Sequence, residues 1–297
     1  MRSDDRHGRY PTARRRFIAV AASACAAPQA FALMAGAAPD TPLARLDANR
    51  ADSPFACVAS LMGGGCYSGV CIAPAFVLTA AHVAAKAKDL FVYLNVGGDL
   101  SHRLGIRRVF TPPAPAHTDP LRPVGDLALL ELDGQLPAGL ALPPLARGPA
   151  RVGQRIELAA YGASGHGDRG VSLACNGALK RIGANRIDRI LGGAEAPTIP
   201  LLYLFRFDPA TGPRRDGLRS LGNSVETGLA SGDSGSPAFV RENGRLALLG
   251  INSFVMRDSA SRGPLNGFGT VGGGQLLAAY KPWLLSVLGA GAWAGLD

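Results

Sequence analysis

The stretch Leu229-Ala230-Ser231-Gly232-Asp233-Ser234-Gly235-Ser236-Pro237 decides how the rest of the chain is interpreted. It is a turn rich in glycine and serine, and the apolar run after it, residues 238–240, predicts a strand. A serine hydroxyl is a weak nucleophile until a base takes its proton and a third group orients that base. Glycine lets successive backbone N–H groups converge where negative charge develops. Ser234 is therefore a candidate nucleophile, and the N–H groups of Gly232 and Ser234 form a candidate oxyanion hole.

Two segments upstream supply the groups that such a serine needs. His82 ends the run Phe76-Val77-Leu78-Thr79-Ala80-Ala81-His82, in which a predicted strand leads into a short helical turn. Asp126 begins Asp126-Leu127-Ala128-Leu129-Leu130-Glu131-Leu132, which predicts a largely buried strand. A carboxylate there loses its hydration, and a hydrogen bond from a donor such as an imidazole N–H must replace the lost water. All histidines precede Ser234, which excludes the Ser, Asp, His chain order of the α/β-hydrolases.

LTAAH ending at His82, DLALLEL beginning at Asp126 and GDSGSP around Ser234 resemble the three signature segments of the trypsin-like (chymotrypsin-fold) serine peptidases, in that family's chain order. The resemblance covers most of the chain after about residue 54. It implies an all-β fold of two antiparallel six-stranded β-barrels packed together, with a short C-terminal helix. It also implies that Ser234 attacks a peptide carbonyl, His82 transfers the proton and Asp126 orients the imidazole.

The composition favours the same fold class. The chain has 297 residues, 47% of them hydrophobic, and its 39 glycines and 22 prolines favour an all-β protein rich in turns. We expect an N-terminal barrel over residues 38–136, a linker rich in proline and glycine over 137–152, and a C-terminal barrel with its terminal helix over 153–297. Pro282 is compatible with that helix only in its first turn.

Residues 1–37 predict an export signal peptide. Arg14-Arg15-Arg16-Phe17-Ile18 begins a mostly apolar stretch, and Ala35-Gly36-Ala37 is an A-x-A-type cleavage site. The Arg-Arg-x-Phe-Ile pattern resembles a twin-arginine signal, and a general secretory signal is an equal alternative. An uncleaved anchor and a lipoprotein site at Cys25 are further alternatives. We expect a secreted or periplasmic protein.

Charge and motif spacing limit the partners. Of the net charge of +9, the six arginines and two aspartates of residues 1–37 carry +4. No block of lysine and arginine follows, so the remaining charge predicts a solvated surface and no nucleic-acid binding. Metal-ligand spacings such as Cys-x-x-Cys are absent, and we expect no metal and no cofactor. The expected partners are protein or peptide substrates, with no membrane after signal removal and a monomeric state.

Four cysteines remain after the predicted signal, an even number in an exported chain. Cys57 and Cys66 flank the segment 61–65, and a hairpin centred near Leu61–Met62 would place them opposite each other. This predicts a disulfide between Cys57 and Cys66. Cys71 and Cys175 either pair or stay free.

The resemblance also implies a substrate pocket. Gly228 falls where trypsins carry an aspartate at the pocket floor, which implies no preference for lysine or arginine. Val255 and Gly267 would form the walls, and Ser253 and Phe254 belong to the strand that lines the substrate, with Ser253 hydrogen-bonded to the triad aspartate. We expect cleavage after small or medium apolar residues.

Two departures from the family keep other functions open. Relatives often carry an Ile-Val-Gly-Gly sequence whose freed amine inserts beside the aspartate matching Asp233, and nothing similar stands between Ala38 and Pro54. A buried Asp233 then needs another donor, either another terminus or an arginine. Ser236 replaces the usual glycine and fits if its φ is negative. The alternative functions are a catalytically impaired trypsin-like fold acting as a binding protein, and an esterase-like hydrolase.

Overall fold

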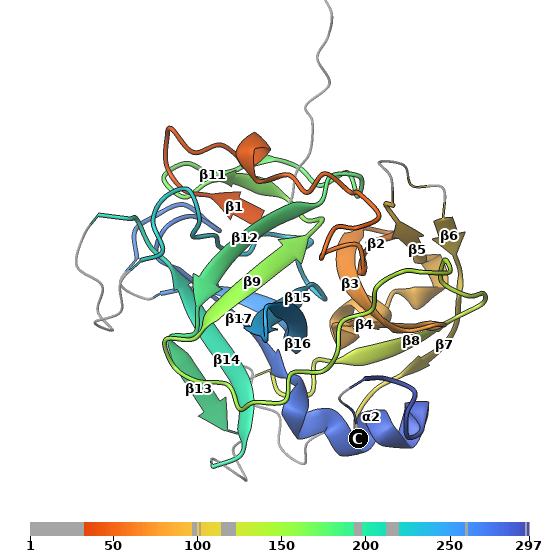
Figure 1. Cartoon of the computed structure of the whole chain (residues 1–297). Coiled ribbons are helices and arrows are strands. Elements are labelled where there is room, and N and C mark those ends of the chain that lie inside the picture. Colours follow the sequence, from red (N-terminus) through yellow and green to blue (C-terminus); the bar gives the residue numbers. More distant parts are fainter. Residues whose placement is uncertain are drawn as a thin grey trace, which may run out of the picture.

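Two seven-stranded antiparallel sheets form the body of the protein (Figure 1). The computed structural model describes residues 33–96, 100, 102–113, 123–192, 198–211, 220–258, 261–294 and 296. The N-terminal sheet has the strand order β6-β5-β2-β3-β4-β8-β7. Its strands are β2 (Val58–Met62), β3 (Cys66–Ala73), β4 (Phe76–Thr79), β5 (Phe91–Leu94), β6 (His102–Leu104), β7 (Ile106–Phe110) and β8 (Ala128–Leu132).

The C-terminal sheet has the strand order β12-β9-β15-β16-β17-β14-β13. Its strands are β9 (Arg155–Ala160), β12 (Arg181–Arg186), β13 (Arg189–Gly192), β14 (Pro200–Phe207), β15 (Pro237–Glu242), β16 (Arg245–Arg257) and β17 (Thr270–Leu276). A third sheet joins β1 (Leu33–Ala35), β10 (Ser164–His166) and β11 (Gly170–Leu173), with β1 parallel to β10.

Each large sheet closes into a barrel because its two edge strands are neighbours in the chain. Only Gly105 separates β6 from β7, and its N–H donates to Asp133 Oδ1 (2.8 Å). Ile187 and Asp188 separate β12 from β13, and their N–H groups bond to backbone outside those two strands. The all-β prediction is confirmed. Seven strands replace the expected six because one long segment in each barrel is interrupted.

The helices are short. They are α1 (Ala81–Ala84), α2 (Lys281–Leu288) and the 3₁₀ turns η1 (Pro42–Arg45), η2 (Ala87–Asp89) and η3 (Leu277–Tyr280). The predicted C-terminal helix is confirmed as η3 and α2, and Pro282 lies in the first turn of α2, where its missing N–H costs nothing. Within the described ranges, no helix combines the length and apolar character needed to cross a bilayer.

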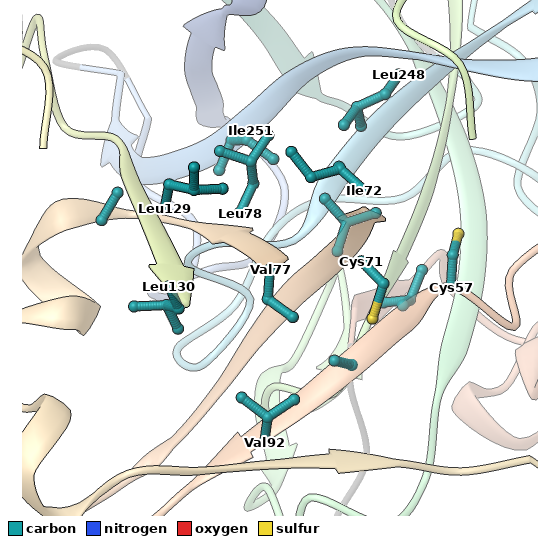
Figure 2. Close-up of a cluster of buried hydrophobic side chains, with 14 of the residues drawn as sticks. Cys57, Cys71, Ile72, Val77, Leu78, Val92, Leu129, Leu130, Leu248 and Ile251 are labelled. Carbon is teal, nitrogen blue, oxygen red and sulfur yellow. The ribbon is translucent and has the colours of Figure 1, made fainter. Parts of the chain in front are cut away.

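One hydrophobic core spans both barrels. Leu78 of β4 and Leu129 of β8 lie in the same cluster as Leu248 and Ile251 of β16, and all four are fully buried (Figure 2). Buried apolar surface contributes roughly 25 cal/mol per Å². Separating the barrels would expose this shared cluster, so their relative position is fixed by the core. Between β8 and β9, where we predicted a linker, the chain contains no helix or strand.

The N-terminal end of the described chain belongs to the folded body. Residues 1–32 of the predicted signal lie outside the described residues. The three side chains of β1 are buried, Gly36 donates its N–H to Asp40 Oδ2 (2.7 Å), and Ala37 donates its N–H to Asn223 Oδ1 (2.6 Å). The A-x-A pattern identifies small residues without regard to their packing. Cleavage after Ala37 would remove β1, whose three side chains are buried.

The predicted Cys57–Cys66 disulfide is wrong. Cys66 is bonded to Cys175, with the two Cα atoms 6.3 Å apart. The hairpin of β2 and β3 turns at residues 63–65 and not near Leu61, so Cys66 lies opposite Met62. Cys66 therefore stands beside the turn, out of reach of the residues before β2.

The same register leaves Cys57 and Cys71 as neighbouring free thiols. The N–H of Cys71 donates to the Cys57 carbonyl (2.8 Å), and both side chains are buried (Figure 2). Burial raises the pKa of the Cys57 thiol to about 12, and it raises the pKa of Cys71 as well. Both groups stay protonated at neutral pH and are poor nucleophiles.

We expect the Cys66–Cys175 bond to contribute about 2–5 kcal/mol to the free energy of unfolding, because it closes a long loop. Urea denaturation of a Cys66→Ala, Cys175→Ala double variant would measure this loss of stability. A reductant should lower the free energy of unfolding of the unaltered protein by the same amount and leave that of the variant unchanged. Alkylation after denaturation without reduction should modify Cys57 and Cys71. A peptide map that links Cys57 to any other cysteine would contradict the assignment.

Candidate active site

His82 and Asp126 form a two-point contact. The chain enters α1 directly from β4, which places the imidazole at the edge of the N-terminal barrel. His82 Nδ1 lies 2.8 Å from Asp126 Oδ2, and the His82 backbone N–H donates to Asp126 Oδ1 (2.9 Å). The Asp126 side chain is 16% exposed and the imidazole 45% exposed. The carboxylate therefore orients the ring and leaves its second nitrogen, Nε2, toward accessible space.

The turn that carries Asp126 is held by the other barrel. The N–H of Gly125 donates to Gln275 Oε1 (3.1 Å) and to the Tyr280 hydroxyl oxygen (2.9 Å). Gln275 Nε2 donates to the Pro123 carbonyl (2.7 Å), and the Tyr280 hydroxyl donates to Gln275 Oε1 (2.9 Å). Gln275 is the next-to-last residue of β17 and is buried. These contacts fix the backbone on both sides of residue 124.

The turn that carries Ser234 belongs to the C-terminal barrel and is held by the N-terminal barrel. The N–H of Ser68 on β3 donates to the Ser234 carbonyl (3.0 Å), and Ser68 Oγ donates to the Gly232 carbonyl (3.2 Å). Gly235 has φ +84°, and a Cβ there would lie 2.0 Å from Thr79 Oγ1. Because Thr79 ends the strand that leads into α1, the Ser234 turn lies against the segment that carries His82.

The Ser234 hydroxyl and the His82 imidazole share no hydrogen bond among the described residues. Both side chains are partly exposed, and the backbone contacts bring their segments together. Hydrogen bonds of this kind are often long without substrate.

The N–H groups around Ser234 fall into two classes. Those of Asp233, Gly235 and Ser236 donate to backbone carbonyls. Within the part of the chain that the structure describes, the N–H groups of Gly232 and Ser234 have no acceptor. Gly232 has φ +92° and approaches the backbone of Cys66 and Gly162 closely. Two unused N–H groups separated by one residue are the arrangement that binds an oxyanion.

Asp233 is a completely buried carboxylate next to Ser234. Its oxygens accept the N–H groups of Ala230 (2.7 Å) and Gly162 (3.0 Å), and the N–H of Leu33 is a third donor. Burial raises the pKa of Asp233 to about 7, against the opposing effect of these donors and of the Arg181 charge. The carboxylate ties two distant segments, at Gly162 and Leu33, to the base of the Ser234 turn.

Ser236, which replaces the usual glycine, fits its site. It is not among the described non-glycine residues with positive φ. Its hydroxyl accepts a hydrogen bond from Asn252 Nδ2 (2.9 Å), and the Tyr203 hydroxyl donates to Asn252 Oδ1 (2.7 Å). The departure from the family pattern therefore adds a buried polar contact.

The predicted pocket residues are only partly brought together. Gly228 is buried, and a Cβ there would lie 2.6 Å from the Phe207 ring. The register of β16 with β17 places Gly272 opposite Val255. Gly267 instead lies in the preceding loop, where a Cβ would meet the Gly167 carbonyl at 2.5 Å. The strand register therefore gives Gly272, and not Gly267, as the residue that faces Val255.

Ser253 and Phe254 lie on β16 as expected, with different partners. The Ser253 hydroxyl accepts a hydrogen bond from Gln275 Nε2 (3.2 Å), and no bond to Asp126 occurs among the described residues. Phe254 lies opposite Gly273, where a Cβ would meet its ring at 2.4 Å. Ser253 thus reaches the Asp126 turn through Gln275.

Sequence reasoning missed the residues that hold the site together. Gln275, Tyr280, Ser68 and Leu33 belong to segments with no catalytic motif. A polar glutamine near the end of a glycine-rich strand was the available signal for Gln275. In the described ranges, no group of three or more His, Cys, Asp or Glu side chains could hold a metal ion.

Comparisons with known proteins identify the family and the fold. A family model described as a trypsin-like peptidase domain matches residues 67–251, more than half of the chain. The solved structure of neuropsin, a serine protease expressed in the limbic system of mouse brain, is similar in fold, with a TM-score of 0.56 and 18% identity. The match covers 82% of this chain and 97% of that one. No curated protein sequence matches.

We expect Gly235→Ala to destabilise the protein by several kcal/mol more than Gly244→Ala. Both glycines have φ near +80°, so both substitutions cost about 1–2 kcal/mol in backbone strain. A Cβ at Gly244 meets nothing within 4 Å, whereas one at Gly235 collides with Thr79 and Ser68. Urea denaturation of the two variants measures the difference, and equal losses would contradict the packing of the Ser234 turn.

Proposed function

The chain belongs to the trypsin-like peptidase family, and from this premise we propose that it is an exported serine endopeptidase acting through Ser234, His82 and Asp126. The observation that carries the proposal is the two-point contact of His82 with Asp126, beside a Ser234 turn packed on the strand that leads to His82. A nucleophile, its base and the group that orients the base are the three parts of such a mechanism.

The proposed reaction proceeds through an acyl-enzyme. Ser234 Oγ attacks the peptide carbonyl carbon while His82 Nε2 takes its proton. Asp126 accepts the Nδ1–H hydrogen bond and stabilises the imidazolium that forms. The imidazolium then returns the proton to the leaving amine, and a water activated by the same base hydrolyses the acyl group.

The unused N–H groups of Gly232 and Ser234 support an oxyanion hole. Their positions in the turn are held by Ser68 and by the buried Asp233, so no reorganisation is needed when charge develops. Each such donor contributes about 3 kcal/mol to lowering the barrier.

The proposed specificity is for small or medium apolar side chains before the cut. Gly228 brings no charge to the floor, and the Phe207 ring packs against it. Leu229 is buried, and its Cδ1 would lie 3.1 Å from a Cβ on Gly272. Together with Val255, these side chains favour a shallow apolar pocket.

Export is supported by the arginine-rich, apolar N-terminal sequence and by the Cys66–Cys175 disulfide, a bond that persists in oxidising compartments. Protein or peptide chains are the substrates that a peptidase of this family takes.

A fluorophosphonate probe should label Ser234, and Ser234→Ala should abolish labelling because the variant lacks the proposed nucleophile. His82→Ala and Asp126→Asn should each lower the rate of peptide hydrolysis by on the order of 10⁴-fold or more. The matched controls are Ser231→Ala, in the same turn, and His102→Ala, at the surface; both should keep full activity.

The failures of this experiment are informative. A folded protein without Ser234-dependent labelling would support the alternative of a catalytically impaired binding protein. Labelling with turnover of esters and none of peptides would support an esterase-like hydrolase.

Digestion of a peptide library should give cleavage mainly after small or medium apolar residues. Val255→Gly should extend cleavage to larger apolar residues by widening the pocket, whereas Val152→Gly, at an exposed position, should not. Cleavage mainly after arginine or lysine in the unaltered protein would refute the proposed pocket.

A further inference from the structure

We propose that a hollow on the outer face of the C-terminal barrel binds an acidic peptide segment, with an apolar side chain of the segment inside the hollow and a neighbouring carboxylate on Arg155. The hollow has a volume of about 320 Å³, and residues of η1, β9, β12 and β15 line it. Its lining residue Arg241 stands near the end of β15, whereas Ser234 stands before the start of that strand. The inference is therefore independent of the proposed peptidase activity.

The strand register explains the apolar floor of the hollow. Ala184 of β12 and Phe239 of β15 both lie opposite Glu157 of β9, so these three side chains share one face of the sheet (Figure 1). Ala184 is small and leaves space between its longer neighbours. Ile182, two residues earlier on the same face, lines this space together with Phe55, whose ring packs on Phe239 with centroids 6.1 Å apart. The floor therefore suits an apolar side chain.

One wall of the hollow is held rigidly. Ala44 and Arg45 of η1 belong to this wall, and the Arg45 side chain is 5% exposed. Its guanidinium donates to the carbonyls of Glu226 (2.8 Å) and Asn223 (2.6 Å), and it forms an ion pair with Asp40 (2.5 Å). Arg45 thus contributes shape to the hollow, while Asp40 offsets its charge. Because the wall is formed in advance, binding requires little ordering of the protein.

The charged rim of the hollow offers a free cation. Arg241 donates to both carboxylate oxygens of Glu157 (2.6 and 2.9 Å), so these two charges offset each other. Arg155 is exposed, and its guanidinium makes no hydrogen bond or ion pair with any residue that the structure describes. An arginine fork binds a carboxylate through two parallel hydrogen bonds. Arg155 beside an apolar floor therefore fits a carboxylate that stands next to an apolar side chain.

A second hollow adjoins the first. It has a volume of about 540 Å³ and is lined by Gln154, Val240 and three residues that also line the first hollow, namely Arg155, Glu157 and Arg241. An extended segment can therefore occupy both hollows by crossing the residues that they share. This arrangement favours a peptide of several residues over a single small anion.

The charge of the surrounding surface determines the sign of the partner. In residues 147–157, 186–189 and 241–245, which lie at one end of the barrel, arginines outnumber carboxylates. A basic surface attracts an acidic partner and repels a basic one. The arginine-rich residues 1–16 of this chain have the same sign of charge and are therefore not the occupant. A nucleic acid would engage a row of cations through its phosphates and would leave the apolar floor unfilled.

The test measures fluorescence anisotropy of a labelled peptide, Gly-Asp-Glu-Phe-Glu-Asp-Gly with blocked ends, mixed with the full chain carrying Ser234→Ala so that the probe stays intact. Arg155→Ala should weaken binding about 10-fold or more, the effect of losing a hydrogen bond between charged groups. Arg151→Ala is the matched control, because this arginine is exposed and lines neither hollow, and it should leave the affinity unchanged. Replacing the peptide's phenylalanine by glycine should also weaken binding about 10-fold or more, since less apolar surface is buried.

A variant that tightens binding separates a ligand contact from a structural role. Glu157→Gln removes a like charge from the rim and releases the Arg241 fork for the peptide. The affinity should rise about 3-fold or more, because the peptide then meets two free guanidinium groups and no opposing carboxylate. A loss of affinity in this variant would contradict the proposed role of the rim.

The remaining outcomes decide between a built site and general attraction of charges. Equal losses in Arg155→Ala and Arg151→Ala, or no effect of the peptide's phenylalanine, would overturn the site, as would no measurable binding. A single-stranded oligonucleotide, or vesicles of phosphatidylglycerol, that bind more tightly than the peptide and depend on Arg155 would overturn the peptide as the partner. Labelling of Ser234 in the unaltered protein tests the peptidase separately, so either proposal can fail while the other stands.

Discussion

A reciprocal set of hydrogen bonds between the two barrels is the constraint on which the candidate site depends. Gln275 and Tyr280 of the C-terminal half hold the turn that carries Asp126, and Ser68 of the N-terminal half holds the turn that carries Ser234. The shared core under these turns, which includes Leu78 and Ile251, fixes the distance between them. Neither barrel positions its own turn of the candidate site without the other, so folding of the barrels and assembly of the candidate site are one event.

The candidate site also requires that the Ser234 turn pack closely against backbone of the N-terminal barrel. Gly235 and Gly232 adopt positive φ and approach Thr79 and the Cys66 carbonyl more closely than a side chain would allow. This close approach lets a short glycine-rich turn expose Ser234. Three N–H groups of the turn donate to carbonyls within the fold, and those of Gly232 and Ser234 have no acceptor among the described residues. The local geometry of the turn follows from its glycines, and the position of the turn is set by its contacts with the opposite barrel.

The sequence predicted those parts of the molecule that are encoded locally. The all-β class, the C-terminal helix with Pro282 in its first turn and the family all follow from motifs and patterns within single segments. The predicted disulfide was wrong because a shift of between two and three residues in one hairpin turn changes every facing pair. Gln275 was missed because it bonds to Gly125, 150 residues away, and nothing in its own strand encodes that distance. Strand register, which places Gly272 opposite Val255, is likewise a property of two segments together.

The position of the Cys66–Cys175 disulfide has a consequence for how the chain folds. In the proposed exported protein, Cys57, Cys66 and Cys71 would leave a translocation channel well before Cys175. An oxidising compartment would favour bonds among those early three while the chain is still extended. The β2–β3 hairpin prevents this by burying Cys57 and Cys71 and leaving Cys66 beside its turn to await a distant partner. Formation of the first barrel would therefore protect the Cys66–Cys175 pairing by withdrawing Cys57 and Cys71 from exchange.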